Sequence, residues 1–176
     1  MIKLGTVFSG IGSIEQALKR LKVDHEIVFA CDNGDIELSL LERGLQKEFK
    51  DLQTKRGKRT LSETDTARLN ELSQKENLLA EETRKYIYSL ADKKAKMDYV
   101  HALYTKNKRR ENHVKNTYLA NYPEVKDFHW DIRFLDGKDY KGEINLLVGG
   151  SHCQAFSTVG AQAGLDDTRG TLFYEF

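Results

Sequence analysis

The sequence predicts an α/β fold with a parallel sheet, interrupted by a long helical insert. Three apolar runs of strand length predict the sheet, at residues 4–8, 26–31 and 144–148. A glycine-rich turn and apolar positions at helical spacing separate the first two runs, and this order is typical of a right-handed βαβ unit. From about residue 35 to 111 the chain is instead rich in Lys, Glu, Arg and Leu, and no strand pattern is visible there.

The composition is that of a folded chain for which we expect no membrane association and no metal. Its 176 residues, 39% of them hydrophobic, are enough for one domain with a core. No apolar run reaches membrane-spanning length, and the start has no signal-peptide pattern. Cys31 and Cys153 lie too far apart in the sequence for a metal-type pair. We therefore expect a cytoplasmic protein with two reduced thiols, while the formal net charge of +1 favours no class of partner.

The turn after the first apolar run has the features of a nucleoside-cofactor site. The stretch Phe8-Ser9-Gly10-Ile11-Gly12 lies where a strand gives way to a helix, and glycine lets a ligand approach the backbone closely. Asp32 follows the next strand, about twenty residues further on, where a carboxylate can bind ribose hydroxyls. The third glycine of the dinucleotide pattern is missing, as is a phosphate-loop ending, so a cofactor without a pyrophosphate is favoured. The alternative is a tight turn in which Asp32 only shapes the backbone.

The middle of the chain has the pattern of a long helical hairpin. Apolar side chains recur at three-and-four spacing along two stretches, and the second also fits the heptad seam of a coiled coil. They are Leu38, Leu41, Leu45, Phe49 and Leu52 in the first stretch, and Leu69, Leu72, Leu79, Tyr86, Leu90, Met97, Val100 and Tyr104 in the second. The basic run 55–59 is the expected turn, and residues 62–65 resemble a capping box that begins the second helix.

This insert has two interpretations. Its charged residues fit a solvent-facing hairpin that stiffens the fold. The alternative is a contact with DNA or a partner, led by the basic runs 55–59 and 106–110.

The sheet pattern resumes after residue 112. A helical stretch over 114–122 precedes Pro123, and the third apolar run, 144–148, leads into a glycine-introduced loop. We assign residues 1–34 and 113–176 to one α/β domain portion and 35–112 to the helical insert. The last stretch looks like a starting helix without a stop signal, so we expect a chain that is cut or completed by another polypeptide.

Cys153 is the candidate nucleophile. It follows the third strand in a loop with polar neighbours, at the edge of a parallel sheet where ligands bind. A helix N-terminus or a nearby cation can lower the pKa of such a thiol and raise its thiolate fraction. The alternative is a small buried hydrophobic residue. Further on, Arg169 can bind a phosphate or form a surface ion pair with an aspartate.

Three stretches in this order resemble the DNA cytosine-5 methyltransferase family. They are Phe8-Ser9-Gly10-Ile11-Gly12, Gly150-Ser151-His152-Cys153-Gln154-Ala155-Phe156-Ser157 and Gly164-Leu165-Asp166-Asp167-Thr168-Arg169-Gly170-Thr171-Leu172-Phe173. The resemblance implies a partial Rossmann-like methyltransferase fold that binds S-adenosylmethionine and acts on double-stranded DNA. It also implies that Cys153 attacks C6 of a flipped-out cytosine, so that C5 can accept the methyl group.

The resemblance assigns the other site residues by position. The residues that would contact the cofactor are Phe8, Gly10, Ile11, Gly12, Asp32, Asn33, Asp131, Ile132 and Leu172. Among them, Asp32 would take the ribose hydroxyls, Asn33 would lie beside the adenine, and Asp131 and Ile132 would border its amino group. The residues that would contact DNA are Gln154, Ser157 and Arg169.

The chain also departs from the family pattern. His152 stands where the family has a proline, whose fixed φ shapes the nucleophile loop, so we expect weakened or lost activity. The family's Glu-Asn-Val motif and its target-recognition part are absent. We therefore expect the chain to be inactive alone and to need a C-terminal half or a complementary subunit. The alternative is a non-catalytic module that binds S-adenosylmethionine or assembles through its helices. A hydrolase using Cys153 and His152 fits less well, because it lacks an orienting third group.

Overall fold

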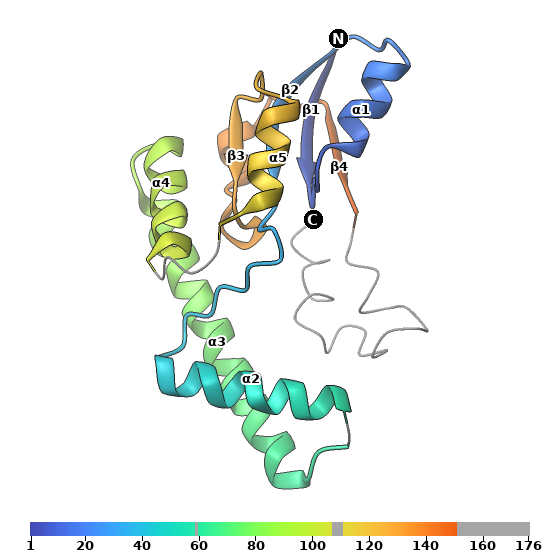
Figure 1. The fold of residues 1–176 in the computed structure, drawn as a ribbon. Helices are drawn as coiled ribbons and strands as arrows, with labels where there is room; N and C mark the ends of the chain where they lie inside the picture. The colour runs from blue at the N-terminus through green and yellow to red at the C-terminus, as the bar shows by residue number, and fades with distance from the viewer. Residues whose placement is uncertain (59, 107–110, 151–176) are drawn as a thin grey trace. The chain divides into compact units, whose positions relative to one another are not determined.

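The computed structural model describes residues 1–150 except 59 and 107–110 (Figure 1). The chain forms two compact units, which we call the sheet unit and the helical unit. The sheet unit comprises Met1–Glu37 and Leu90–Phe176, and the helical unit comprises Leu38–Ser89.

In the described part of the chain, the sheet unit is built on four parallel strands in the order β3-β2-β1-β4. The strands are β1 (Ile2–Val7), β2 (His25–Cys31), β3 (Asp127–His129) and β4 (Leu146–Gly149). The predicted α/β class with a parallel sheet is confirmed, and the three apolar runs form β1, β2 and β4. The short strand β3 was not predicted, because two of its three side chains are polar.

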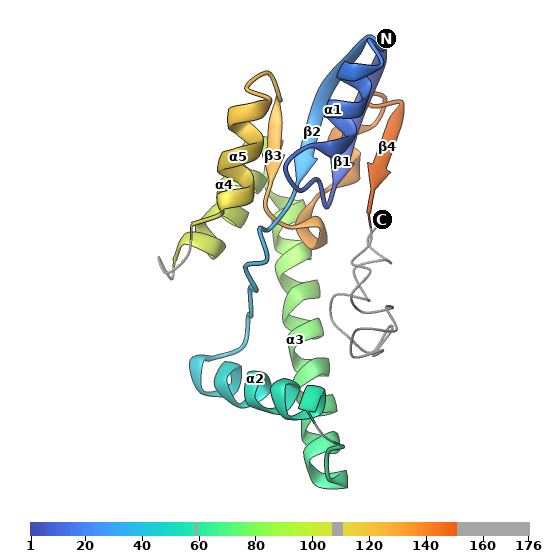
Figure 2. The same cartoon turned by 45° about the vertical axis from the view of Figure 1, so that its right-hand side comes forward.

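Helices and short turns cover both faces of the sheet (Figures 1 and 2). Helix α1 (Ser13–Arg20) connects β1 to β2, and α5 (His113–Asn121) precedes β3. Tyr118 and Tyr122 from the α5 region pack with apolar side chains of β2 and β3 on one face. The 3-10 turns η1 (Ile132–Phe134) and η2 (Gly137–Tyr140) contribute to a second cluster on the other face. The central strands β1 and β2 are therefore buried on both faces, as is typical of a parallel sheet.

Gly5 lets an aromatic ring pack directly against β1. A Cβ atom on Gly5 would lie 2.6 Å from Cε1 of Phe29, which is closer than side chains tolerate. The Phe29 ring in turn packs against Tyr140, with the ring centroids 4.5 Å apart. The strand register skips Val28 at this point, so β2 carries a bulge opposite Leu4 and Gly5.

The helical unit is a hairpin of α2 (Arg43–Lys58) and α3 (Glu63–Ser89). Its core consists of side chains that the sequence pattern had selected, namely Leu41, Phe49, Leu52, Leu69 and Leu72. The expected turn at 55–59 is wrong in position, because α2 remains helical through Lys58. The Ser62 hydroxyl accepts a hydrogen bond from the Asp65 backbone N–H at 3.2 Å, as the capping pattern indicated.

The predicted heptad seam does not continue as one helix. Helix α3 ends at Ser89, and α4 (Lys93–Thr105) begins after Asp92, whose carboxylate accepts a hydrogen bond from Ala95 N at 2.8 Å. Helix α4 belongs to the sheet unit, although it lies within the insert expected over 35–112. Of the helices in the described part of the chain, none is both long enough and apolar enough to cross a membrane.

Candidate functional site

The carboxyl ends of three strands meet at one edge of the sheet. Val7 at the end of β1 pairs with Cys31 at the end of β2, and Cys31 pairs with His129 at the end of β3. Three turns leave from this level: the glycine turn over 8–12, the Asp32–Gly34 turn and the segment that begins at Trp130. Ligands of open α/β sheets bind at such an edge.

The glycine turn holds unusual backbone conformations. Phe8 has a φ of 53°, Gly10 of 54° and Gly12 of 92°. Gly12 caps α1, and a Cβ atom there would lie 2.1 Å from the ring of Tyr122, whose hydroxyl donates to the Gly12 carbonyl at 2.8 Å. A Cβ atom on Gly10 would instead meet no atom of the described residues within 4 Å. The turn is therefore packed tightly against Tyr122 at Gly12, whereas the open space beside Gly10 leaves room for a ligand.

A buried carboxylate lies beneath this turn. Glu15, fully buried in the first turn of α1, accepts hydrogen bonds through one oxygen from Thr6 Oγ1 at 2.8 Å and from Tyr118 Oη at 2.6 Å. These bonds join β1, α1 and α5. Burial and the nearby Glu15 carboxylate raise the pKa of Tyr118, so its hydroxyl remains a donor.

Asp32 ties the glycine turn to the turn after β2. One carboxylate oxygen accepts from Gly10 N and the other from Gly34 N, each at 2.8 Å. Asn33 makes a local turn contact of its own, since its Oδ1 accepts from Asp35 N at 3.1 Å. Asp32 therefore shapes the backbone, as the alternative interpretation expected. A carboxylate has about four lone-pair sites, so it can still accept hydrogen bonds from a ribose.

Asp131 is enclosed by protein donors. It is 6% exposed, and one oxygen accepts from Arg133 N at 3.0 Å. The other accepts from Tyr104 Oη and from Arg133 Nη2, both at 2.7 Å. Burial and the Asp131 charge raise the pKa of Tyr104, which therefore stays protonated as a donor. Ile132, next in sequence, is buried in the core. The backbone carbonyls of Asp131 and Ile132 accept from Phe134 N and Leu135 N at 3.2 Å, so each keeps one lone pair for a ligand.

Asn112 contacts the site although the sequence interpretation missed it. The residue is 2% exposed and caps α5 by accepting from Lys115 N at 2.8 Å. Its Nδ2 donates to the backbone carbonyl of Asp32 at 3.0 Å. The cap position before a helical stretch is a signal that could have been found, but the contact with Asp32 joins residues 80 positions apart.

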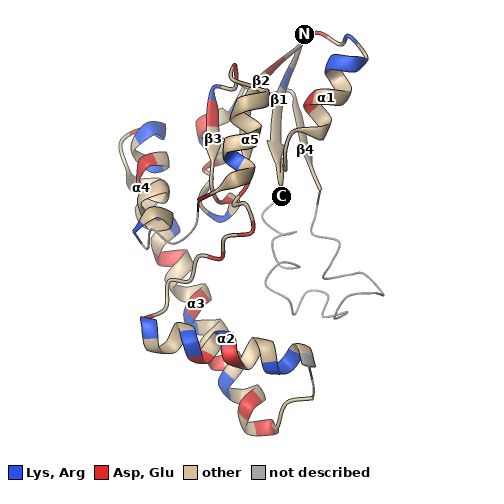
Figure 3. Ribbon diagram, in the orientation of Figure 1, with Lys and Arg blue, Asp and Glu red and all other residues tan. Residues whose placement is uncertain are grey.

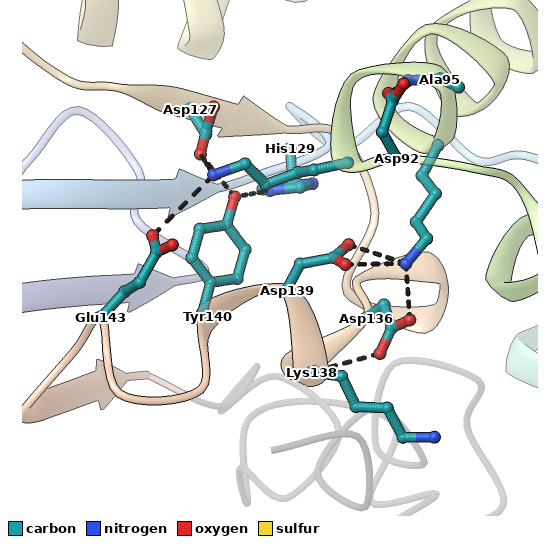
Figure 4. Close-up of polar contacts among 11 residues, drawn as sticks. Asp92, Ala95, Asp127, His129, Asp136, Lys138, Asp139, Tyr140 and Glu143 are labelled. Atoms are coloured by element: carbon teal, nitrogen blue, oxygen red, sulfur yellow. Dashed lines mark hydrogen bonds and ion pairs between the residues drawn. The ribbon is translucent and has the colours of Figure 1, made fainter.

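Lysines fasten helix α4 to β3 and η2 (Figure 4). Lys93 Nζ lies 2.7 Å from an Asp127 carboxylate oxygen and 4.6 Å from the centre of the Tyr140 ring. Lys96, one turn further on, lies 2.8 Å from both Asp136 and Asp139. Because the Lys96 and Asp136 side chains are 11% and 7% exposed, this pair is shielded from solvent, unlike ordinary surface ion pairs.

A half-buried histidine completes this contact region. Tyr140 donates its hydroxyl proton to Asp127 at 2.8 Å, and His129 Nε2 lies 2.6 Å from the Tyr140 oxygen. Since Tyr140 has only one proton to donate, the His129 Nε2–H must be the donor, which assigns the tautomer. Burial lowers the pKa of His129 to about 4. His129 is therefore neutral near pH 7.

Cys31 is a buried thiol rather than a second nucleophile candidate. It is 2% exposed at the end of β2. Burial, together with the charges of Asp131 and Asp32, raises its pKa well above the ordinary value. It therefore remains protonated and packs as a small apolar side chain.

The structure brings together only part of the predicted site. Three turns at one edge carry Phe8, Gly10, Ile11, Gly12, Asp32, Asn33, Asp131 and Ile132. The remaining predicted residues lie outside the described part of the chain. They are Cys153, Gln154, Ser157, Arg169 and Leu172. Strand β4 ends at Gly149, shortly before the nucleophile stretch.

Comparison with known proteins identifies the family. A parallel α/β sheet with a glycine turn and an acidic residue after the second strand is typical of domains that bind a nucleoside cofactor. The family model for C-5 cytosine-specific DNA methylase matches residues 88–176, which is half of the chain. The chain therefore belongs to the C-5 cytosine-specific DNA methylase family.

Individual relatives are similar over shorter stretches. The chain is 41% identical over 66 residues to the type II methyltransferase M.Eco47II of Escherichia coli, which covers 38% of this chain and 16% of that protein. It is 51% identical over 59 residues to M1.ScrFI of Lactococcus lactis subsp. cremoris, covering 34% and 14%. For M.NgoPII of Neisseria gonorrhoeae the identity is 40% over 60 residues, covering 34% and 18%. The matched part of the chain thus spans less than a fifth of each relative, and no solved structure matches it.

Proposed function

We propose that this chain is the cofactor-binding and nucleophile-bearing part of a DNA cytosine-5 methyltransferase. The observation that carries the proposal is the edge of the sheet at which Asp32 joins the glycine turn to the turn after β2. Membership of the methylase family supplies the reaction class. S-adenosylmethionine, the methyl donor of this family, supplies an activated methyl group on a sulfonium.

The residues at the sheet edge fit a nucleoside. Gly10 leaves open space above the turn, and Asp32 keeps lone pairs for ribose hydroxyls although each of its oxygens already accepts one backbone N–H. Asn33 lies in the same turn and borders the base. The Asp131 carboxylate is fully engaged by Tyr104 and Arg133, so the 131–132 segment borders the adenine amino group with its backbone. Phe8, Ile11, Gly12 and Leu172 complete the cofactor contacts.

Cys153 is the proposed nucleophile toward cytosine. C5 of cytosine is a poor nucleophile, and addition of the Cys153 thiolate to C6 makes C5 electron-rich enough to accept the methyl group. Loss of the C5 proton and departure of the thiolate then restore the aromatic ring. The cytosine must leave the helix first, because a duplex hides C6 from side chains. Gln154, Ser157 and Arg169 contact the DNA around it, and binding weakens as salt rises.

The chain needs a partner segment to turn over. The Glu-Asn-Val motif, whose glutamate stabilises the protonated ring, is absent from the sequence. His152 replaces the family proline before the nucleophile, and a residue without a fixed φ leaves the thiol less well placed. We therefore infer that a C-terminal half or a complementary subunit supplies the missing parts.

A trapping experiment tests this proposal. The chain is mixed with S-adenosylmethionine, a C-terminal methyltransferase half supplied in trans, and duplex DNA carrying 5-fluorocytosine, which cannot lose its C5 substituent as a proton. We expect a covalent adduct at Cys153 by mass spectrometry, no adduct with Cys153→Ser, and more adduct with His152→Pro. Cofactor binding without any adduct supports instead a non-catalytic binding module. Robust methylation by the isolated chain would contradict the need for a partner.

A further inference from the structure

Two side chains that flank the connection between α4 and α5 reach the turns of the proposed cofactor site. Tyr104, in the last turn of α4, donates to the Asp131 carboxylate at 2.7 Å. Asn112, the cap of α5, donates to the Asp32 backbone carbonyl at 3.0 Å. We propose that Tyr104 and Asn112 are positioning residues that hold the adenine-side turn and the ribose-side turn, respectively. The inference rests on the proposed function, because it concerns the same site.

Tyr104 is fixed in place by its surroundings. Its ring lies 5.0 Å from that of Trp130, centre to centre, and the residue is 8% exposed. The other end of α4 is fastened by Lys93 and Lys96 to carboxylates of β3 and η2 (Figure 4). The docked helix and the contact with Trp130 therefore favour the position in which the phenol donates to Asp131.

Asn112 is fitted equally closely to the turn after β2. A Cβ atom on Gly34 would lie 2.3 Å from Asn112 Oδ1, so the turn packs directly on the amide. The same oxygen accepts from Lys115 N, which fixes the orientation of the amide and points Nδ2 at the Asp32 carbonyl. Asn112 thereby fixes the backbone carbonyl of Asp32, while the Asp32 carboxylate accepts from the backbone N–H groups of Gly10 and Gly34.

The two contacts act on different parts of the ligand. Tyr104 and Arg133 occupy the Asp131 carboxylate, which leaves the backbone of that segment facing the base. Asn112 holds the residue whose spare lone pairs face the ribose. Removing the Tyr104 hydroxyl should therefore weaken the contact with the adenine amino group, and removing the Asn112 donor should weaken the contact with the ribose hydroxyls.

Binding by calorimetry separates positioning from folding for Tyr104. Tyr104→Phe should weaken S-adenosylmethionine about 5- to 30-fold, which corresponds to one lost charge-assisted hydrogen bond acting through Asp131. The same variant should bind the hypoxanthine analogue, which lacks the 6-amino group, within about twofold of the unsubstituted chain. Tyr140→Phe is the matched control, because it also deletes a hydroxyl that donates to a partly buried aspartate, Asp127 at 2.8 Å. It should bind both ligands like the unsubstituted chain.

Asn112→Asp tests the second contact. It keeps the acceptor that caps α5 but removes the donor to Asp32, and it should weaken S-adenosylmethionine about 3- to 10-fold. The 2′-deoxyribose analogue should show little of this loss. Asp92→Asn, the reverse exchange at the cap of α4, is the matched control and should leave both affinities unchanged.

The outcomes are distinct. Ligand-selective losses in Tyr104→Phe and Asn112→Asp support the positioning roles. Equal losses for every ligand, or no loss in variants with unchanged melting temperatures, overturn them and leave the proposed function standing. No binding of S-adenosylmethionine by the unsubstituted chain overturns the proposed function and the positioning roles together.

Discussion

The sheet unit and the helical unit each bury a carboxylate among protein donors, but only one of these carboxylates lies at the sheet edge where we propose that the cofactor binds. In the sheet unit, Asp131 accepts from Tyr104 and Arg133 beside the turns that leave β1, β2 and β3. In the helical unit, Glu76 of α3 is 8% exposed and accepts from the backbone of Leu40 and Leu41 and from the Ser39 hydroxyl. Several donors satisfy each carboxylate, and the surroundings of the two carboxylates differ.

The difference shows what each buried charge does. Glu76 fastens the segment before α2 to α3, so its network holds the hairpin together. The Asp131 network joins α4, which was expected to belong to a solvated insert, to the edge where the cofactor is proposed to bind. Satisfied polar networks fix one packing arrangement, and the consequence depends on which elements they join.

Removing the Asp131 carboxylate should have the largest effect on stability. Asp131→Ala leaves the buried Tyr104 hydroxyl without its acceptor and removes the carboxylate that pairs with Arg133, which should cost about 3 kcal/mol of unfolding free energy. Urea unfolding followed by the emission of Trp130, the single tryptophan of the chain, measures this in the sheet unit. Asp98→Ala is the control, because its pair with Lys94 is exposed, and it should change the free energy by less than about 0.5 kcal/mol. Equal effects of the two substitutions would show that the Asp131 network does not hold α4.

The corresponding change in the helical unit should be smaller. Glu76→Ala removes the acceptor of three donors, of which the Leu40 N–H and the Ser39 hydroxyl are part-buried, and should cost roughly 2 kcal/mol. Helical circular dichroism should show an earlier urea transition, while the Trp130 transition stays where it is. Glu81→Ala, on the exposed surface of the same helix, should leave both transitions unchanged. A shift of the Trp130 transition in Glu76→Ala would refute independent unfolding of the two units.

The sequence could predict those elements and site residues of the two units that depend on local patterns. Apolar runs revealed β1, β2 and β4, and the leucine spacing revealed the core of the helical unit. Strand β3 was not predicted, because Asp127 and His129 are polar. Their partial burial depends on contacts with Tyr140 and Lys93, which lie outside the strand in the sequence. The glycine turn and Asp32 were predicted for the site, because their spacing is local.

Other parts of the site depend on long-range packing. Lys93 and Lys96 have the pattern of solvated charges, so nothing local indicates that α4 docks on the sheet unit. Tyr104 was assigned to a heptad seam, yet its hydroxyl binds Asp131. Asn112 contacts a residue 80 positions away. These assignments could not be made from periodicity, because periodicity selects a face of a helix and not its partner.

Acidification should weaken the sheet unit through His129. Its pKa is about 4 in the folded chain and near 6.5 when unfolded, so the unfolded chain binds the proton more readily. The stabilisation is therefore fully present above about pH 6.5 and is lost as the pH falls toward 4, by roughly 1–3 kcal/mol. Comparing Trp130-monitored unfolding of the unsubstituted chain and His129→Gln between pH 7 and pH 4.5 isolates this contribution from that of the carboxylates. Identical pH slopes in the two proteins would contradict it.

The smallest effect is expected from the basic surface of the helical unit. Figure 3 shows that positively and negatively charged residues are interspersed along the ribbon of α2 and α3, and Lys55 of the 55–59 run pairs with Asp65. Mixed charges of this kind form a solvated face more readily than a DNA-binding one, because attraction to phosphates needs a local excess of positive charge. Reversing Arg56 to Glu should change the unfolding free energy by less than about 0.5 kcal/mol and leave the affinity for DNA of the chain combined with a C-terminal half unchanged at two salt concentrations. A weaker affinity with a shallower salt dependence would assign the 55–59 run to a DNA contact, and the helical unit would then share the ligand-binding role that is proposed for the sheet unit alone.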